Sequence, residues 1–337
     1  EKDRADHYEA ARSLMDDGEY EEAIAAFSRM GEYKDSPEMA VECQNTLDYN
    51  AAKALMKGNQ FEQARDALTA LGSFGDAQAL AEECQHTLDY NAAVALMNEG
   101  KLDSARDAFL ALGDFMDAQE IAAQCQNGID YDAAVSMMNA GQYAEAMSAF
   151  NALGDYSDAA GQAAECQRNI DYFAADEAYQ NGFFYTAYVA FSALGDFGDA
   201  ATRAGQCIQP APENGELYRN PDFGKKISFT IKNDDKSQSA CVKIYTEDGV
   251  LVSTVFIRPS SKTKIKLQAG SYRFKEAIGY DWFGDKEYFG ASGTYSVMQF
   301  EDGELQTLST SRYYTLTLML DNGDGNVGGS PETMEGF

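Results

Sequence analysis

The sequence predicts two structural classes in one chain: an all-α array of helical repeats, followed by an all-β antiparallel sandwich. Two observations predict the array. A tyrosine and a cysteine each recur every 41 residues, and the apolar residues within a repeat follow helical spacing. One observation predicts the sandwich, because apolar residues beyond position 224 alternate in short runs. The predicted domains are the array at 1–209, a linker at 210–224, and the sandwich at 225–337 with a glycine-rich tail.

The 41-residue period runs through five units without an insertion. Fixed self-similarity of this length is typical of stacked repeats, here an α-solenoid of αα-hairpins. The markers of the period are Tyr8, Tyr49, Tyr90, Tyr131 and Tyr172, together with Cys43, Cys84, Cys125, Cys166 and Cys207.

Each repeat is predicted to hold one short and one long helix. The short helix of the first unit starts near Tyr20 and ends at Gly31, where a glycine can adopt the left-handed conformation that closes a helix. In the second unit the apolar spacing stays in phase over 77–97, which predicts one long helix. The long helices should end before a glycine such as Gly100, and Asn59 takes that place once.

A short phrase, written LGDYSDA at 153–159, joins the two helices in every unit. Its glycine ends the short helix, its aromatic residue is spaced to fold back over the hairpin, and its aspartate stands where the next helix needs an N-cap. The phrase is therefore interpreted as a structural joint, and ligation of a metal by these aspartates is disfavoured. The predicted N-caps are Asp35, Asp76, Asp117, Asp158 and Asp199.

Charge and composition restrict the function. The net charge is −29, and residues 1–209 hold 37 acidic against 12 basic side chains, so the array should repel nucleic acid. No apolar stretch is long enough to span a membrane, and the acidic surface favours a monomer. The sequence contains no catalytic triad, zinc-binding pattern or phosphate-binding loop, so we expect neither an enzyme nor a cofactor.

The predicted sandwich carries two candidate binding surfaces. Lysines alternate with apolar residues on one strand, and Arg273 and Lys275 do so on the next, so five cations could share an outer face that binds an anion. The alternative is a solvated face whose lysines discourage aggregation. The five cations are Lys262, Lys264, Lys266, Arg273 and Lys275.

The second candidate is the segment 279–290, GYDWFGDKEYFG, which we call the aromatic segment. Dense aromatic rings between glycines can form a platform that binds a sugar or a peptide. The alternative is that the rings cover the end of the sandwich as a structural plug. The candidate platform residues are Tyr280, Trp282, Phe283, Tyr288 and Phe289.

Two resemblances follow from these motifs. The pattern G-x-Y-x-x-A-x-x-x-F at Gly141–Phe150 resembles tetratricopeptide (TPR or Sel1-like) repeats, and the 41-residue form is similar to repeats of Gram-positive bacterial surface proteins. The segment from Leu267 to Tyr272 resembles a hairpin of transthyretin-like and carboxypeptidase-regulatory-type sandwiches. The helical resemblance implies a right-handed superhelix that acts as a scaffold for protein interactions.

The leading functional hypothesis is a non-enzymatic scaffold of the bacterial cell envelope that binds a protein or peptide in the helical groove. It would lie outside the cell, anchored through a segment upstream of this chain. One alternative is a sandwich that binds carbohydrate or an anionic cell-wall polymer, with the array as its stalk. Another is a cytosolic assembly factor, which the six cysteines would suit because unpaired thiols are less usual outside cells.

Overall fold

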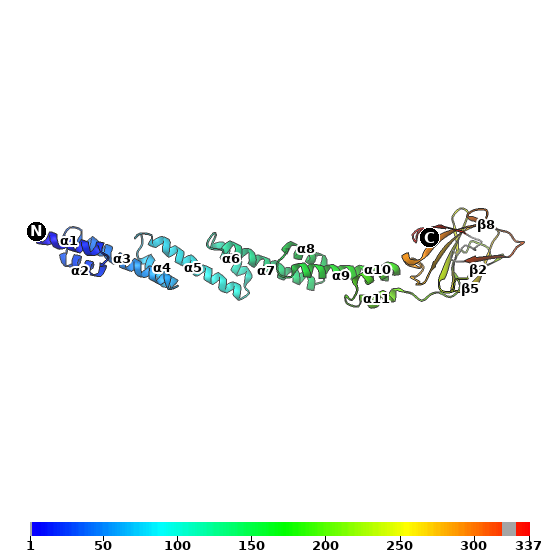
Figure 1. The fold of residues 1–337 in the computed structure, drawn as a ribbon, viewed down its shortest axis with the longest axis horizontal. Helices are drawn as coiled ribbons and strands as arrows, with labels where there is room; N and C mark the ends of the chain where they lie inside the picture. Colours follow the sequence, from blue (N-terminus) through cyan, green and yellow to red (C-terminus); the bar gives the residue numbers. More distant parts are fainter. Residues whose placement is uncertain (1, 319–327) are drawn as a thin grey trace. The chain divides into compact units, whose positions relative to one another are not determined.

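A computed structural model describes residues 2–318 and 328–337. It confirms the predicted order, because the described residues form eleven helices followed by β-sheets (Figure 1). The chain divides into two compact units, Glu1–Ala160 and Gly161–Phe337. The division falls near the start of the helix α9, so the last helices of the array belong to the same unit as the sheets.

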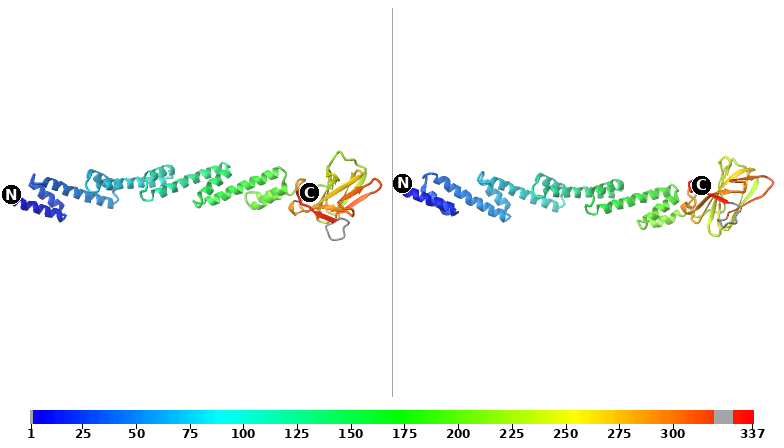
Figure 2. Two further views of the ribbon diagram at one scale, coloured as in Figure 1. Left: turned by 90° about the horizontal axis from the view of Figure 1, so that it is seen from above. Right: turned by 45° about the horizontal axis from the view of Figure 1, so that its top comes forward.

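The first unit alternates short and long helices. Its helices are α1 (Lys2–Asp16), α2 (Tyr20–Met30), α3 (Ser36–Lys57), α4 (Phe61–Ala70), α5 (Ala77–Asn98), α6 (Leu102–Ala111), α7 (Ala118–Asn139) and α8 (Tyr143–Leu153). The predicted long helix at 77–97 is confirmed by α5. Both views of Figure 2 show the long helices of this unit as uninterrupted.

The cores of the first unit are small three-helix clusters. Each cluster combines the second half of one long helix, the next short helix and the first half of the following long helix. One core joins Ala11, Phe27 and Cys43, the next Ala52, Leu68 and Cys84, and a third Ala93, Phe109 and Cys125. Consequently α3 and α5 each contribute their two halves to two consecutive cores.

The ends of the long helices have the conformation that the sequence predicts. Gly100 has φ +77° and Asn59 has φ +57°, both in the left-handed region that a Cβ disfavours. The amide of Gly100 donates to the carbonyl of Met97 and that of Lys101 donates to Leu96, which closes α5. Asn59 thus replaces glycine without a change of geometry.

The second unit begins with α9 (Ala159–Gln180), α10 (Phe184–Leu194) and α11 (Ala200–Cys207). These helices form a core of the same design around Ala175, Phe191 and Cys207. The strands that follow, which we call the β domain, are β1 (Gly215–Arg219), β2 (Ile227–Asn233), β3 (Ser239–Thr246), β4 (Leu251–Ile257), β5 (Ser261–Leu267), β6 (Gly270–Gly279), β7 (Thr294–Gln299), β8 (Leu305–Leu308), β9 (Tyr314–Leu318) and β10 (Gly328–Pro331).

The described strands form two sheets. The larger has the order β1-β4-β3-β6-β7-β10 with β8 also paired to β6, and the smaller has the order β5-β2-β9. Two details differ from the prediction. The predicted linker at 210–224 contains β1, which pairs with β4, and β2 and β9 pair in parallel although an antiparallel sandwich was expected. Most of the predicted glycine-rich tail lies outside the described residues.

The larger sheet is covered on both faces. One face packs on the smaller sheet, with Val242 and Phe274 on one side and Phe229 and Leu316 on the other. The opposite face, around Phe256, is covered by the aromatic segment, the short 3-10 helix Gly290–Ser292 and the C-terminal residues of the chain. The aromatic segment therefore belongs to a second core of the β domain.

Candidate functional site

The lysines of β5 lie on the exposed face of the smaller sheet. Ile265 and Leu267 point into the core between the sheets, and the lysines alternate with them toward solvent. No carboxylate among the described residues lies within salt-bridge distance of these lysines. The exposed side chains are Lys262, Lys264 and Lys266.

Arg273 and Lys275 do not share this face, which corrects the five-cation surface expected from the sequence. β5 and β6 are not paired with each other, because the chain crosses from the smaller to the larger sheet between them. Arg273 pairs with Glu304 at 3.1 Å, and Lys275 pairs with Glu332 at 2.8 Å. Lys275 also donates to the carbonyl of Gly336 at 2.5 Å, so it holds the C-terminal residues against the larger sheet.

The neighbour of β5 is β2, which adds lysines that the sequence did not single out. Lys232 stands directly opposite Lys262, and Thr230 stands opposite Lys264. Lys226 precedes β2 and is exposed, on the side opposite to the buried Ile227. We call this surface the lysine face, and define its cations as Lys226, Lys232, Lys262, Lys264 and Lys266.

Hydroxyl groups stand between and beside the lysines. Ser228 is opposite Lys266, while Thr315 and Thr317 of β9 flank Thr230 and Lys232 on the other side of β2. Tyr313 comes immediately before β9 and is 94% exposed. The one carboxylate that pairs with a lysine of this face, among the described residues, is Asp234, which lies 2.7 Å from the Nζ of Lys232.

The expected aromatic platform is largely buried. Four of its five side chains, those of Trp282, Phe283, Tyr288 and Phe289, are at most 7% exposed, and only Tyr280, at 67%, faces solvent. The rings of Trp282, Tyr288 and Phe289 pack with Phe256 of β4, and the centroids of Trp282 and Phe256 are 5.0 Å apart, whereas Phe283 contacts Tyr185 and Tyr188 of α10. The rings therefore cover the larger sheet and do not form an open surface for a ligand.

The same segment attaches the β domain to the last helices of the array. The carboxylate of Glu287, only 5% exposed, lies at the N-terminus of α10. It accepts hydrogen bonds from the backbone amides of Tyr185, at 2.6 Å, and Thr186, at 3.2 Å, and from the Thr186 hydroxyl at 2.5 Å. The free amides and the positive end of the helix dipole make this end of α10 a favourable place for a buried carboxylate.

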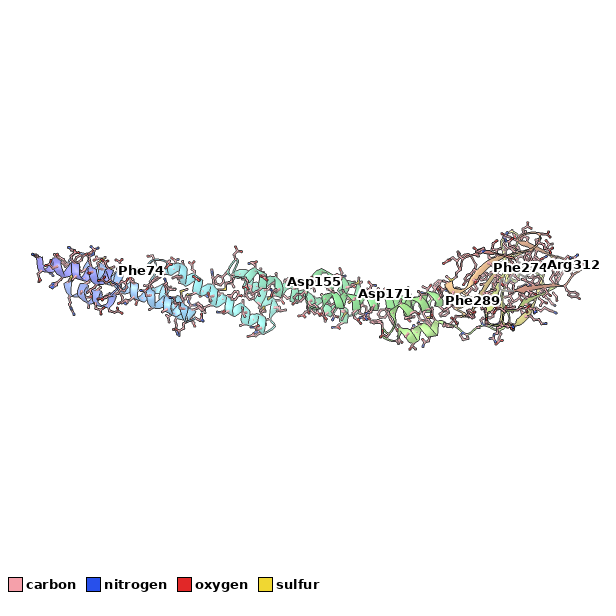
Figure 3. The ribbon with its side chains drawn as sticks, in the orientation of Figure 1. Phe74, Asp155, Asp171, Phe274, Phe289 and Arg312 are labelled. Atoms are coloured by element: carbon pink, nitrogen blue, oxygen red, sulfur yellow. The ribbon has the colours of Figure 1, made fainter. Side chains whose placement is uncertain are left out.

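Neighbouring contacts complete this attachment, which we call the Glu287 joint to distinguish it from the joints within the repeats. Lys286 Nζ donates to the carbonyl of Asn181 at 2.6 Å, and the ring centroid of Phe283 lies 5.1 Å from that of Tyr185. Gly290 has φ +61°, and a Cβ at this position would collide with the Tyr185 ring. Figure 3 shows Phe289 where the β domain meets α10, and Arg312 at the opposite end of the domain. Glu287 could not be found from the sequence, because its helix partner lies about a hundred residues earlier.

The aspartates predicted to be N-caps occupy the expected position but bond differently. At α3, α5, α7 and α11 the aspartate precedes the first helical residue, yet its side chain makes no capping hydrogen bond. Each carboxylate instead accepts a hydrogen bond from the tyrosine hydroxyl of the preceding long helix. The pairs are Tyr8–Asp35, Tyr49–Asp76, Tyr90–Asp117, Tyr131–Asp158 and Tyr172–Asp199.

The backbone gives a physical reason, because Asp117 has φ −105° and ψ 22°, outside the β region that an N-cap residue usually adopts. The tyrosine hydroxyl of the long helix reaches the carboxylate, at 2.6 Å for Tyr90 and Asp117, and a charged acceptor makes this bond stronger than a neutral one. The bond lowers the pKa of the Asp35 carboxyl and raises the pKa of the Tyr8 hydroxyl. The aromatic residue of the joint was predicted to fold back over the hairpin, and in the structure it contacts this tyrosine; the ring centroids of Tyr90 and Phe115 are 6.3 Å apart.

The remaining features to consider in the described part of the chain are metal ligands, membrane-spanning helices and cysteine thiols. Among these residues no cluster of histidine, cysteine and carboxylate side chains could hold a metal ion, and no helix has the length and apolar character needed to cross a bilayer. All six cysteines are buried and unpaired. Burial raises the pKa of Cys207 to about 11 and that of Cys241 to about 12, so neither thiol is activated as a nucleophile.

Comparison of the chain with family models, curated proteins and solved structures gave no match.

Proposed function

We propose that this chain is a non-enzymatic binding protein in which the β domain contacts the ligand and the helical array is a semi-rigid spacer. The observation that carries the proposal is the sharing of long helices, because α3 and α5 each join two consecutive cores. A continuous helix leaves no loop at which neighbouring cores could bend freely, whereas a flexible linker would behave as a random coil.

The β domain is the better candidate for ligand contact. Its smaller sheet presents the lysine face, whereas the array is strongly acidic. The joint at Glu287 fixes the β domain to α10, as a spacer requires if it is to hold a binding domain in a defined orientation to its last helices. This assignment favours the hypothesis of an anionic polymer bound by the sandwich over that of a partner in a helical groove.

A protein or peptide partner of the array is the second candidate, and one observation favours it. A shallow hollow lies beside α3, lined by Pro37, Val41 and Phe74 together with acidic side chains. Val41 is 59% exposed, whereas a glutamate or an alanine stands at the equivalent position in the next three units. An exposed apolar residue in one unit could mark a contact with a partner.

The assignment of each domain to a fold family belongs to the same proposal. The array would be a variant of tetratricopeptide-like repeats, and the β domain a relative of transthyretin-like sandwiches. A place in the cell envelope suits a spacer that carries a polymer-binding domain. The buried thiols are compatible with that place, because burial protects them from oxidants.

The spacer role is tested by a distance measurement within the first unit. Spin labels are attached to Glu32→Cys and Asp114→Cys, two exposed loop positions separated by α3 to α6, in the full chain. Pulsed electron paramagnetic resonance should give one narrow distance distribution. Thr87→Pro in the middle of α5 should broaden it, because an interior proline costs a helix about 3 kcal/mol. Thr87→Ala is the matched control, and a broad distribution in the unaltered chain would contradict the spacer role.

A further inference from the structure

The lysine face contains an unfavourable charge arrangement that the fold alone does not explain. Lys232 and Lys262 are directly opposite each other on adjacent strands, where like charges destabilise a sheet. Asp234 lies near one of them only. Such local conflicts are expected at functional sites, where a ligand supplies the missing counter-charge.

Protection of a sheet edge does not account for all of these lysines. β5 is an edge strand of the smaller sheet, so its three lysines could serve to discourage aggregation. β2 is the central strand, paired on both sides, and has no free edge to protect. Edge protection therefore does not explain Lys232 on β2. Its ion pair with Asp234 leaves the opposite Lys262 without a carboxylate among the described residues, and a bound anion would supply that charge.

The arrangement of the cations favours a linear ligand with regularly repeated charges. Along β5 every second residue is a lysine, so the three ammonium groups follow one another at intervals of roughly 7 Å. Lys226 and Lys232 extend the charged rows onto the adjacent strand, about 4.8 Å away. A single small anion could contact only part of this surface, whereas an extended polyanion could contact all of it.

The side chains on the face also indicate the kind of anion. All five cations of the face are lysines, whose ammonium groups bind phosphate as point charges and do not impose the fixed planar geometry of an arginine fork. Four hydroxyl groups, those of Ser228, Thr230, Thr315 and Thr317, stand among them and can bond to phosphate oxygens or to hydroxyls of a ligand. Binding of single-stranded nucleic acid relies on several stacked aromatic rings, and Tyr313 is the one exposed ring beside this face in the described residues.

The geometry points to a linear phosphodiester-linked polyol polymer as the ligand of the lysine face. Its phosphates would lie along β5 and β2, and its hydroxyl groups would meet the threonines and Ser228. This inference rests on the proposed function, since it assigns a ligand class to the β domain. It also revises the site expected from the sequence, because Lys226 and Lys232 join it and Arg273 and Lys275 leave it.

The test measures binding of the full chain to poly(glycerol phosphate) by isothermal titration calorimetry at low and moderate salt. Lys262→Gln, Lys264→Gln and Lys266→Gln are introduced together. The matched control replaces three exposed lysines elsewhere, Lys57, Lys101 and Lys236, by glutamine, which gives the same change in net charge. We expect the face variant to bind at least about 10-fold more weakly, the control to bind normally, and the affinity of the unaltered chain to fall with salt.

Each other result overturns the inference. No binding to poly(glycerol phosphate), or equal binding by the face variant, would exclude this face as its site. Stronger binding to phosphatidylglycerol vesicles or to oligothymidylate would replace the polymer by a membrane surface or by nucleic acid. The spin-label distances test the proposed function separately. A narrow distribution combined with failed polymer binding would leave the spacer role in place and remove only the ligand assignment.

Discussion

At the scale of single residues, the β domain contains a carboxyl group in an unfavourable place. Glu276 of β6 points toward the same side as Phe274 and Ile278, which belong to the core between the sheets. Its Oε1 is buried and has no hydrogen-bond partner among the described residues. Burial raises the pKa of this carboxyl to about 7, because the charged form is poorly solvated at this half-buried position.

This pKa predicts a dependence of stability on pH. In the unfolded chain Glu276 ionises near pH 4.5, whereas in the folded chain it stays protonated up to about pH 7. The free energy of unfolding should therefore be unaffected by this group below about pH 4, fall as the pH rises toward 7, and stay reduced above it. Glu276→Gln should stabilise the protein on the order of 2 kcal/mol at pH 8 and much less at pH 4.

Chemical denaturation at several pH values measures this effect. The exposed Glu247→Gln is the control, because it makes the same chemical change in the same domain. Equal stability of Glu276→Gln and the unaltered chain at pH 8 would show that the carboxyl is solvated or paired in solution.

At the scale of secondary-structure elements, the helices were predictable and the sheet pairing was not. Helix bounds follow from local signals, such as the left-handed Gly100 and Asn59 that end long helices. The alternation on β5 correctly separates Lys264 from Ile265, but it does not specify which strand lies beside β5. The chain between β5 and β6 was expected to form a hairpin, and a crossing between sheets has no local sequence signal that distinguishes it.

The tyrosine–aspartate hydrogen bond, found where an N-cap bond was predicted, links one long helix to the start of the next. A double-mutant cycle tests its contribution to stability. In the joint of the third repeat, at 112–118, the Tyr90 hydroxyl of α5 donates to Asp117, which precedes α7. Tyr90→Phe and Asp117→Asn should each destabilise the protein by about 1 kcal/mol, and the double variant should cost less than their sum. Additive effects would instead indicate that Asp117 acts alone, as the N-cap that the sequence predicted. Urea denaturation gives the three free energies.

At the scale of the whole molecule, the boundary between the two compact units differs from the change in secondary structure. The sequence places the boundary at 209, where helices give way to strands, whereas the second compact unit begins at Gly161 and includes α10 and α11. The cause is the aromatic segment, whose contacts with α10 are separated by about a hundred residues in the chain. Such long-range pairing leaves no periodic pattern, so the sequence allowed either a platform or a plug and could not identify a joint.

If the Glu287 joint couples the β domain to the last helices, removing the Glu287 carboxylate should loosen α10 without unfolding the sheets. Glu287→Ala leaves the amides of Tyr185 and Thr186 without their charged acceptor, and a hydrogen bond to a charged group contributes about 1.5–3 kcal/mol. Hydrogen exchange followed by mass spectrometry should show roughly 10-fold to 100-fold faster exchange at the start of α10.

The control for this experiment is Asp285→Ala, an exposed acidic residue two positions earlier in the aromatic segment. It should leave exchange in α10 unchanged, and the amides of β3 and β6 should stay protected in both variants, because both strands are paired with neighbours on each side. Unaltered exchange in α10 of Glu287→Ala would mean that the remaining contacts hold the joint, namely the Phe283–Tyr185 ring contact and the Lys286–Asn181 hydrogen bond. The orientation of the lysine face relative to α10 would then depend on these contacts, and Gly290→Val, which collides with Tyr185, would be the variant that releases it.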